Sequence, residues 1–351
     1  MRYVWNWLAT PGPAWRVGLL RLVSATWLLL HFLPRLTESL PDQVGLPSEW
    51  FVLPGLLGEW IPPPSRVDPS LLAPGVGVLA LLGGLTCLGI GVRVAGVLFA
   101  LGMGLLAAWQ MGFGFFDHEL VLLVEVLLVV VLAPGGDALG VKGVLNKSRG
   151  LVASTDNSGL PGGGGDVPAW GERLVLLLLL SVYLAAGIAK LRWGGCSWFS
   201  GQTLAFYFSG VAGDFGRQLL FSSAWEAESA WRDGIGLTDF TYRSIGSELS
   251  RSIAARPTIL QWMAFGGTVL ETSAPVALYS IPLRNVYLVV MAAFHLMNGI
   301  LMGLPFYGYQ LLCVSLLVWR GTAGLSTGAN DPVHGGVPGA SLSSSDHGGS
   351  G

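Results

Sequence analysis

The chain has 351 residues, of which 52% are hydrophobic and only 11% are charged, and its formal net charge is −2. A soluble globular chain carries about 25% charged residues, so this composition argues against a soluble domain. The net charge offers no basic surface for nucleic acid, and three cysteines are too few for a disulfide framework. No cluster of cysteine and histidine predicts a metal site, so we expect no metal cofactor.

The apolar residues come in blocks near the length of about 20 residues that a helix needs to cross a bilayer. We therefore predict an all-α integral membrane protein, a polytopic bundle of about eight transmembrane helices. The expected helices cover residues 16–34, 71–91, 94–113, 119–133, 171–190, 257–279, 285–303 and 306–319. A further apolar stretch, 50–61, is too short to cross and precedes three prolines, so we expect it to lie at the interface or to re-enter.

Two segments have compositions that predict no regular structure. Residues 150–168, which include four consecutive glycines, are interpreted as a flexible cytoplasmic linker. Residues 322–351 are rich in glycine and serine, without apolar periodicity, and are interpreted as a disordered tail. The expected organisation is one transmembrane domain over residues 1–321, with the linker inside it, followed by the tail.

Charges in the short loops predict how the helices are oriented. Lys142, Lys147 and Arg149 follow the fourth helix, whereas the 35–70 loop carries more acidic than basic residues. By the positive-inside rule the N-terminus is cytoplasmic, and eight crossings return the C-terminus to the same side. The tryptophan-bearing segment 192–256 then faces outward, where we expect it to pack on the lipid bilayer.

Ionisable residues inside membrane helices are costly, so each one is a candidate functional residue. The predicted orientation places His118 and Lys190 at outer helix ends and His295 near the middle of the membrane, so all three can line one outward-opening cavity. Glu271, midway along the sixth predicted helix, would lie at its floor. Each residue also has a structural interpretation: Lys190 snorkels to the interface, His118 is an interfacial or a capping residue, and His295 and Glu271 make interhelical hydrogen bonds.

Two segments around these residues have a recognisable pattern. Residues 294–298, Phe-His-Leu-Met-Asn, resemble the Phe-His-x-Met-Asn segment of vitamin K-dependent gamma-glutamyl carboxylase. Residues 186–191, Ala-Gly-Ile-Ala-Lys-Leu, resemble the same family's Ala-Gly-x-x-Lys-Leu segment, with Tyr183 before it and Trp198 and Gly201 after it.

Two further segments extend the resemblance. Residues 117–120, Asp-His-Glu-Leu, together with 141–146, resemble the family's Asn-His segment and the stretch that follows it. Residues 270–274, Leu-Glu-Thr-Ser-Ala, are similar to the acidic segment just before the Phe-His helix. Because the four segments occur in the family's order, they make the resemblance specific over about residues 110 to 330. The wider group is the family of horizontally transferred transmembrane domains.

The resemblance implies a chemistry for these residues. The lysine that matches Lys190 is the base that deprotonates vitamin K hydroquinone, and the histidine that matches His118 assists carbanion formation or carboxylation. The implied cofactors are reduced vitamin K or another lipophilic quinol, with O2 and CO2. A lysine accepts a proton only as the neutral amine, which a low-dielectric surrounding favours. With Lys190, His118 and His295 as candidate catalytic residues, the candidate quinone pocket comprises Tyr183, Trp198, Gly201, Glu271, Met297 and Asn298.

The sequence also departs from the family pattern. Asp117 replaces an asparagine, Glu271 an aspartate and Ala189 a second lysine. The chain ends after the membrane region and lacks the family's large lumenal domain, so the acceptor of carboxylation is unknown. The leading hypothesis is a carboxylase-like membrane enzyme. The alternatives are a non-enzymatic scaffold or ligand-binding protein with the same helices and, third, a transporter, which no internal repeat supports.

Overall fold

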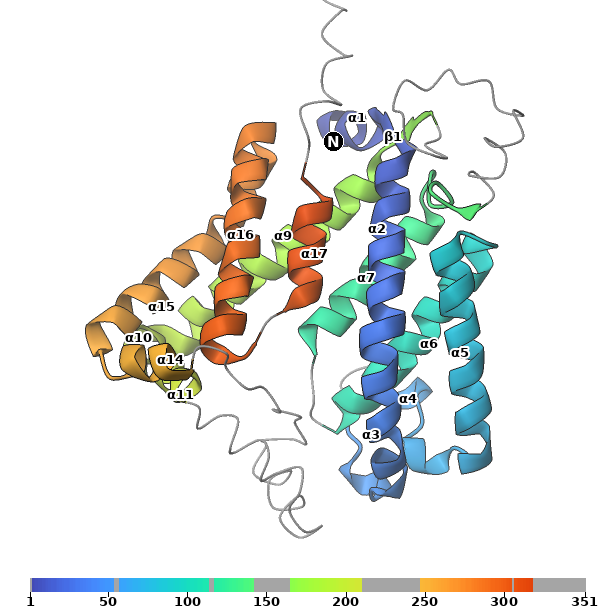
Figure 1. The fold of residues 1–351 in the computed structure, drawn as a ribbon, viewed down its shortest axis with the longest axis horizontal. Coiled ribbons are helices and arrows are strands. Elements are labelled where there is room, and N and C mark those ends of the chain that lie inside the picture. The colour runs from blue at the N-terminus through green and yellow to red at the C-terminus, as the bar shows by residue number, and fades with distance from the viewer. Residues whose placement is uncertain are drawn as a thin grey trace, which may run out of the picture. The chain divides into compact units, whose positions relative to one another are not determined.

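Long apolar helices make up most of the structure, a computed structural model (Figure 1). It describes residues 2–53, 57–113, 117–141, 165–209, 247–304 and 306–317, all of them within the unit formed by residues 1–317. The predicted tail 322–351 lies outside the described residues, as do residues 150–164 of the predicted linker and 210–246 of the predicted outward segment.

The chain begins with a short helix and a strand that pairs with a distant one. Helix α1 (Arg2–Ala9) leads into β1 (Pro11–Pro13), which pairs antiparallel with β2 (Asp166–Pro168) in the register Gly12 to Val167. The last residues of the predicted flexible linker are therefore an ordered strand, and in this respect the prediction is wrong. The strand pairing could not be predicted from the sequence because a three-residue strand is too short to show alternating hydrophobicity.

The next helix is longer than predicted. Helix α2 (Ala14–Trp27) continues through a π-helical turn (Leu28–Phe32) into α3 (Leu33–Gly45), so one helical rod covers residues 14–45. Pro34 in the first turn of α3 has no N–H and would crowd the carbonyl four residues before it. The wider π-helical turn just before this proline accommodates both effects.

Three more helices complete the N-terminal part. Helices α5 (Leu72–Leu88) and α7 (His118–Leu132) pack on α2, and α6 (Val92–Gly112) packs on α5 and α7. Gly89 and Gly91 both have positive φ, which lets the chain turn tightly between α5 and α6. The apolar stretch 50–61 contains only a 3-10 turn (Ser48–Trp50) and the short helix α4 (Leu57–Trp60), and 3-10 turns at Pro64–Arg66 and Pro69–Leu71 follow.

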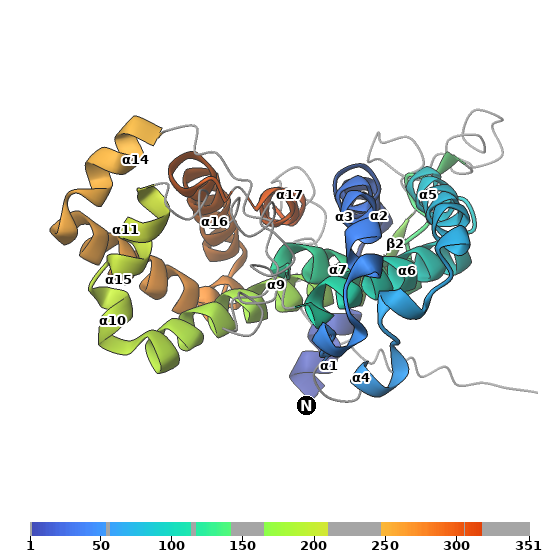
Figure 2. The same ribbon diagram turned by 90° about the horizontal axis from the view of Figure 1, so that it is seen from below.

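The C-terminal part is built on α9. Helix α9 (Trp170–Ala189) continues into a π-helical turn (Lys190–Gly194), and the short helices α10 (Gly195–Phe199) and α11 (Gln202–Phe208) follow. Helix α14 (Ser247–Ala254) leads to α15 (Pro257–Thr272), a 3-10 turn (Ala274–Leu278), α16 (Ile281–Met302) and α17 (Tyr307–Ser315). Figure 2 shows α10, α11, α14 and α15 grouped at one end of α9.

The buried apolar residues form two clusters. The larger one joins α2, α6, α7, α9, α16 and α17 and includes Leu20, Phe99, Leu127, Leu179 and Leu288. The smaller one joins α11, α15 and α16 through Leu204, Phe208, Leu260, Ala264 and Leu301.

The predicted helical and apolar character is confirmed, but the lengths of the helices differ. Within the described residues, five helical segments are long and apolar enough to cross a membrane: 14–45, 69–88, 92–112, 170–194 and 281–302. Helices α7, α15 and α17 have 15, 16 and 9 residues, which is shorter than a typical span. The predicted helix 257–279 is interrupted at Ser273, because Pro275 cannot continue the α-helical hydrogen bonding.

Candidate functional site

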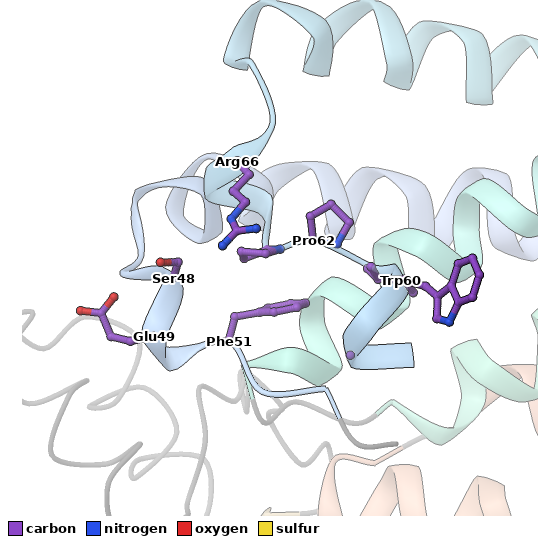
Figure 3. Close-up of a pocket in the computed structure, with 9 residues that line it drawn as sticks. Ser48, Glu49, Phe51, Trp60, Pro62 and Arg66 are labelled. Atoms are coloured by element: carbon purple, nitrogen blue, oxygen red, sulfur yellow. The ribbon is translucent and has the colours of Figure 1, made fainter. Parts of the chain in front are cut away.

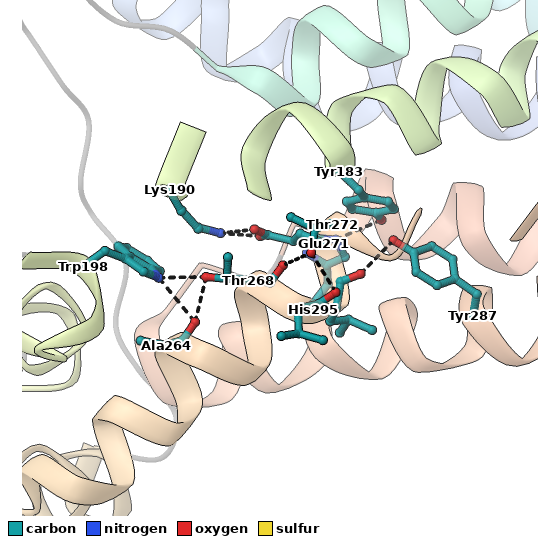
Figure 4. Close-up of polar contacts among 11 residues, drawn as sticks. Tyr183, Lys190, Trp198, Ala264, Thr268, Glu271, Thr272, Tyr287 and His295 are labelled. Atoms are coloured by element: carbon teal, nitrogen blue, oxygen red, sulfur yellow. Dashed lines mark hydrogen bonds and ion pairs between the residues drawn. The ribbon is translucent and has the colours of Figure 1, made fainter. Parts of the chain in front are cut away.

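Lys190 and Glu271 form an ion pair between two helices (Figure 4). The Lys190 Nζ donates to both carboxylate oxygens of Glu271. Glu271 is 5% exposed and lies in the last turn of α15, not midway along a longer helix as predicted, because α15 ends at Thr272. A buried carboxylate needs a cation partner, and Lys190 just after α9 provides it.

A glycine on α9 allows this close approach. A Cβ added to Gly187 would lie 2.7 Å from Thr272 Cγ2, 2.9 Å from the Thr272 backbone nitrogen and 3.2 Å from Glu271 Cβ. The first two distances are shorter than side chains allow. Gly187, one turn before Lys190, therefore sets the spacing of α9 and α15 at the ion pair.

Trp198 contacts the same lysine from α10. Its ring centroid is 5.0 Å from Lys190 Nζ, in the range of a cation–π interaction. Its indole Nε1 donates to Thr268 Oγ1 at 3.0 Å and to the Ala264 carbonyl at 3.3 Å, which fixes the ring against α15. The ammonium group is thus placed between a carboxylate and an aromatic face.

His295 lies in a group of aromatic side chains. Its Nε2 is 3.0 Å from the Tyr183 hydroxyl, which in turn is 3.4 Å from Cys313 Sγ. The Tyr309 ring centroid is 5.0 Å from the imidazole and the Phe306 centroid 5.5 Å. His295 is 6% exposed, and its Nδ1 is buried without a hydrogen-bond partner among the described residues.

Tyr287 connects this aromatic group to the helix that carries Glu271. Its hydroxyl donates to the Leu270 carbonyl at 3.4 Å, and its ring centroid is 6.2 Å from that of Tyr183. The predicted residues Lys190, Glu271, Trp198, Tyr183 and His295 therefore belong to one neighbourhood, made by α9, α10, α15 and α16 (Figure 4).

His118 lies on α7, which is not one of these four elements. It is the exposed first residue of α7, and Asp117 caps the helix by accepting from the backbone nitrogens of Glu119 and Leu120. The interpretation of His118 as the capping residue is therefore wrong, because Asp117 caps the helix. The expectation that His118, Lys190 and His295 line one cavity stays a prediction.

Three predicted pocket residues have other positions. Met297 is 44% exposed, because two helix positions after His295 bring it to the opposite face. Asn298 is half-buried on α16, and its carbonyl accepts from the Leu304 nitrogen at 3.3 Å as the helix ends. Gly201 has φ +79° and packs on Leu260, so its role is to turn the chain into α11.

The candidate residues did not include Glu119, although it is buried at 7% exposure. Its Oε1 accepts from Trp27 Nε1 at 2.9 Å and from the Gly308 nitrogen at 2.8 Å, so it joins α7 to α2 and α17. The Trp27 ring stacks on His31 at 4.6 Å. Glu119 could have been recognised from the sequence as an acidic residue at the start of an otherwise apolar helix.

A cavity of about 480 Å³ lies elsewhere, beside the 3-10 turns that follow α3 (Figure 3). It contains none of the predicted site residues. Its lining residues are Ser48, Glu49, Phe51, Gly58, Trp60, Ile61, Pro62, Pro63 and Arg66. Two of them pack on the end of α6: the Pro62 carbonyl accepts from Trp109 Nε1 at 3.0 Å, and Phe51 contacts Phe113.

Among the described residues, no group of three or more histidine, cysteine, aspartate or glutamate side chains is arranged to hold a metal ion. No known protein family, curated protein or solved structure matches the chain significantly.

Proposed function

We propose that the protein is a membrane enzyme, similar to the membrane part of vitamin K-dependent carboxylase, that removes a proton from a lipophilic quinol. The observation that carries the proposal is the buried Lys190–Glu271 pair beside Trp198. An ion pair in an apolar helical bundle is costly to bury and is commonly retained at functional positions. Its residues also match the lysine and the acidic segment of the resemblance.

In this proposal the two side chains of the ion pair have different roles. With Lys190 donating to both oxygens of Glu271, the carboxylate is the group with free lone pairs for a quinol O–H. The ammonium group stays beside the oxygen that becomes negatively charged and stabilises it. The neutral-amine mechanism is the alternative for the same site, and the two differ in which substitution stops the reaction.

His295 supplies a second polar position near this pair. Its Nε2 is occupied by Tyr183, whereas Nδ1 has no partner among the described residues. A quinol has two oxygens on opposite sides of its ring, so Nδ1 is a suitable partner for the oxygen that does not lose its proton first. The apolar tail of the quinol suits the exposed apolar surfaces of α15 and α16, such as Val269 and Val290.

The proposal includes the topology. All eight predicted helices cross, with the shorter α7, α15 and α17 completed by flanking residues, and both termini are cytoplasmic. Residues Ser65 and Asp166 are exposed and fall on opposite sides in this arrangement. In a variant without Cys87, Cys196 and Cys313, a membrane-impermeant thiol reagent should label Ser65→Cys in intact cells and Asp166→Cys only after lysis. Labelling of both from one side would reject the topology.

The decisive experiment is an assay of the purified protein in detergent with reduced vitamin K, O2 and bicarbonate, with the quinone epoxide measured by mass spectrometry. Glu271→Gln should abolish the product if the carboxylate is the base, and Lys190→Arg should retain part of the activity. If the amine is the base, Lys190→Arg should fail too, because a guanidinium stays protonated. Glu125→Gln, at an exposed acidic residue of α7, is the matched control and should leave the rate unchanged.

The runner-up function is a non-enzymatic scaffold or ligand-binding protein. The observation that favours it is that Lys190 and Glu271 already satisfy each other. In that case wild-type protein forms no epoxide, and the same substitutions change only the melting temperature. Epoxide formation that disappears in Glu271→Gln while the protein stays folded would exclude this function.

A further inference from the structure

A second group of charged side chains lies at the other end of α9, and it does not take part in the proposed function. Arg16 on α2, Glu172 and Arg173 on α9, and Arg284 on α16 make up this group, which we call the basic cluster. Arg16 Nη2 is 3.0 Å from Glu172 Oε1, and Arg284 lies within electrostatic range of Arg16, Glu172 and Arg173. Three guanidinium groups thus share one carboxylate.

The single carboxylate is already engaged. Arg16 binds Glu172 and also donates to the carbonyls of Leu316 and Leu317, at 3.2 and 3.3 Å, where α17 ends. Arg173 and Arg284 have no carboxylate within ion-pair distance among the described residues. Arg173 Nη1 and Arg284 Nε are buried, and neither has a hydrogen-bond partner among those residues. Two positive charges in the cluster therefore remain uncompensated.

The positions of these two arginines in their helices add to the uncompensated positive charge. Arg173 is in the first turn of α9 and Arg284 in the first turn of α16. The N-terminal end of a helix carries a partial positive charge that favours anions and disfavours cations. A negatively charged group between the two helix starts would satisfy both guanidiniums and both helix ends.

A neighbouring helix places a tryptophan ring beside the cluster. Helix α1 contacts α9, and the ring of its Trp7 lies 5.4 Å from the Arg173 guanidinium carbon. Tryptophan and arginine next to apolar helices are typical of the zone where lipid headgroups meet the hydrocarbon. Val286 on α16 is 62% exposed but lies two helix positions after Arg284, on the opposite face, so Trp7 is the side chain that places the cluster at this zone.

We propose that the basic cluster binds the phosphate group of an anionic phospholipid, with Arg173 and Arg284 as its main contacts. Guanidinium groups bind phosphate through paired, charge-assisted hydrogen bonds, which matches the unpartnered nitrogens of both residues. Trp7 would lie at the headgroup level, and the lipid tails would extend from the bound phosphate into the bilayer. A free phosphate ion offers the same oxygens but lacks the tails, so the two sources are distinguishable.

The test is a titration of the full-length protein in detergent with phosphatidylglycerol and, separately, with inorganic phosphate. Bound lipid is counted by native mass spectrometry, and the melting temperature is followed in parallel. Phosphatidylglycerol should bind and raise the melting temperature, whereas inorganic phosphate should have little effect. The variant Arg173→Gln/Arg284→Gln should bind the lipid roughly thirtyfold more weakly, since each arginine contributes about 1 kcal/mol to headgroup binding.

A matched control distinguishes the loss of this site from a general change in net charge. Arg93→Gln/Arg251→Gln removes two exposed arginines of α6 and α14 and should leave the affinity within about twofold. In lipid-free detergent, Arg173→Gln/Arg284→Gln should melt no lower than wild type, because it relieves repulsion. The proposal is overturned if the control variant loses as much lipid affinity as Arg173→Gln/Arg284→Gln, or if inorganic phosphate raises the melting temperature as much as the lipid does. It is also overturned if Arg173→Gln/Arg284→Gln is less stable than wild type without lipid, because the guanidiniums would then already have stabilising partners.

Discussion

The two ends of α9 each carry an ion pair, but their charge balance differs. At the start, Glu172 is shared by the arginines of the basic cluster, and at the end Lys190 has Glu271 to itself. Glu172 in the first turn of α9 and Lys190 after its last turn both suit the helix dipole, whereas Arg173 in the first turn opposes it. The balanced pair is suited to moving a proton, and the unbalanced cluster to attracting an anion, so one helix separates two kinds of chemistry.

Glu271→Gln should have the largest effect on stability, because it leaves a partly buried lysine without a counter-charge. Breaking a buried ion pair typically costs about 3–5 kcal/mol. Denaturant unfolding of the detergent-solubilised protein measures the loss. The double variant Lys190→Met/Glu271→Leu should recover most of it, since both charges are then gone. If the single and double variants are equally unstable, the ion pair is not the cause.

Glu172→Gln should cost less, about 2 kcal/mol, although Glu172 is nearly as buried as Glu271. Arg16 keeps two carbonyl acceptors at the end of α17, whereas Lys190 without Glu271 keeps only the face of Trp198. The same unfolding measurement compares the two variants directly. A loss as large as that of Glu271→Gln would remove the distinction between the two ends of α9.

Gly187→Ala should destabilise the protein by about 1–3 kcal/mol, because the new methyl group overlaps Thr272 and pushes α15 away from Lys190. The matched control is Gly266→Ala on α15, where an added Cβ meets nothing within 4 Å. Alanine favours helix over glycine, so the control should be neutral or stabilising. The melting temperatures of the two variants should therefore shift in opposite directions.

Tyr183→Phe should have the smallest effect, about 1 kcal/mol, because it removes one hydroxyl from the buried contact with His295. The ring stays, so the packing on Tyr309 and Tyr287 is kept. Thermal unfolding of this variant, of His295→Phe and of the double variant gives the coupling free energy between the two side chains. A Tyr183→Phe protein with unchanged stability would show that the hydroxyl is not a useful partner of His295.

The sequence predicted the helices well because apolar blocks carry that information without help from tertiary contacts. It placed Lys190, Glu271, Tyr183 and His295 on a common candidate site, and the contacts bring them together. The direct pairing of Lys190 with Glu271 was not predictable. It depends on where α15 ends and on the missing side chain of Gly187, and neither follows from hydrophobicity.

Other features could not be predicted from the sequence because they join residues that are far apart in the chain. The basic cluster brings residues 16, 172, 173 and 284 together, and no local pattern links them. His118 and Met297 were chosen because they match motif positions of the family, but a motif match does not show which face of a helix a residue occupies. Adjacent residues on a helix point to different faces, so Glu119, next to His118, is buried while His118 is exposed.

The pairing of β1 with β2 has a consequence for how the chain is assembled. Roughly 150 residues separate the two strands, and at about 5–20 residues per second the ribosome needs on the order of 10–30 s to make them. During that time α2, α5, α6 and α7 emerge while β1 has no partner and α1 has no α9 to contact. The strand pair therefore closes after the first helices are in place, and it marks the moment at which the N-terminus docks.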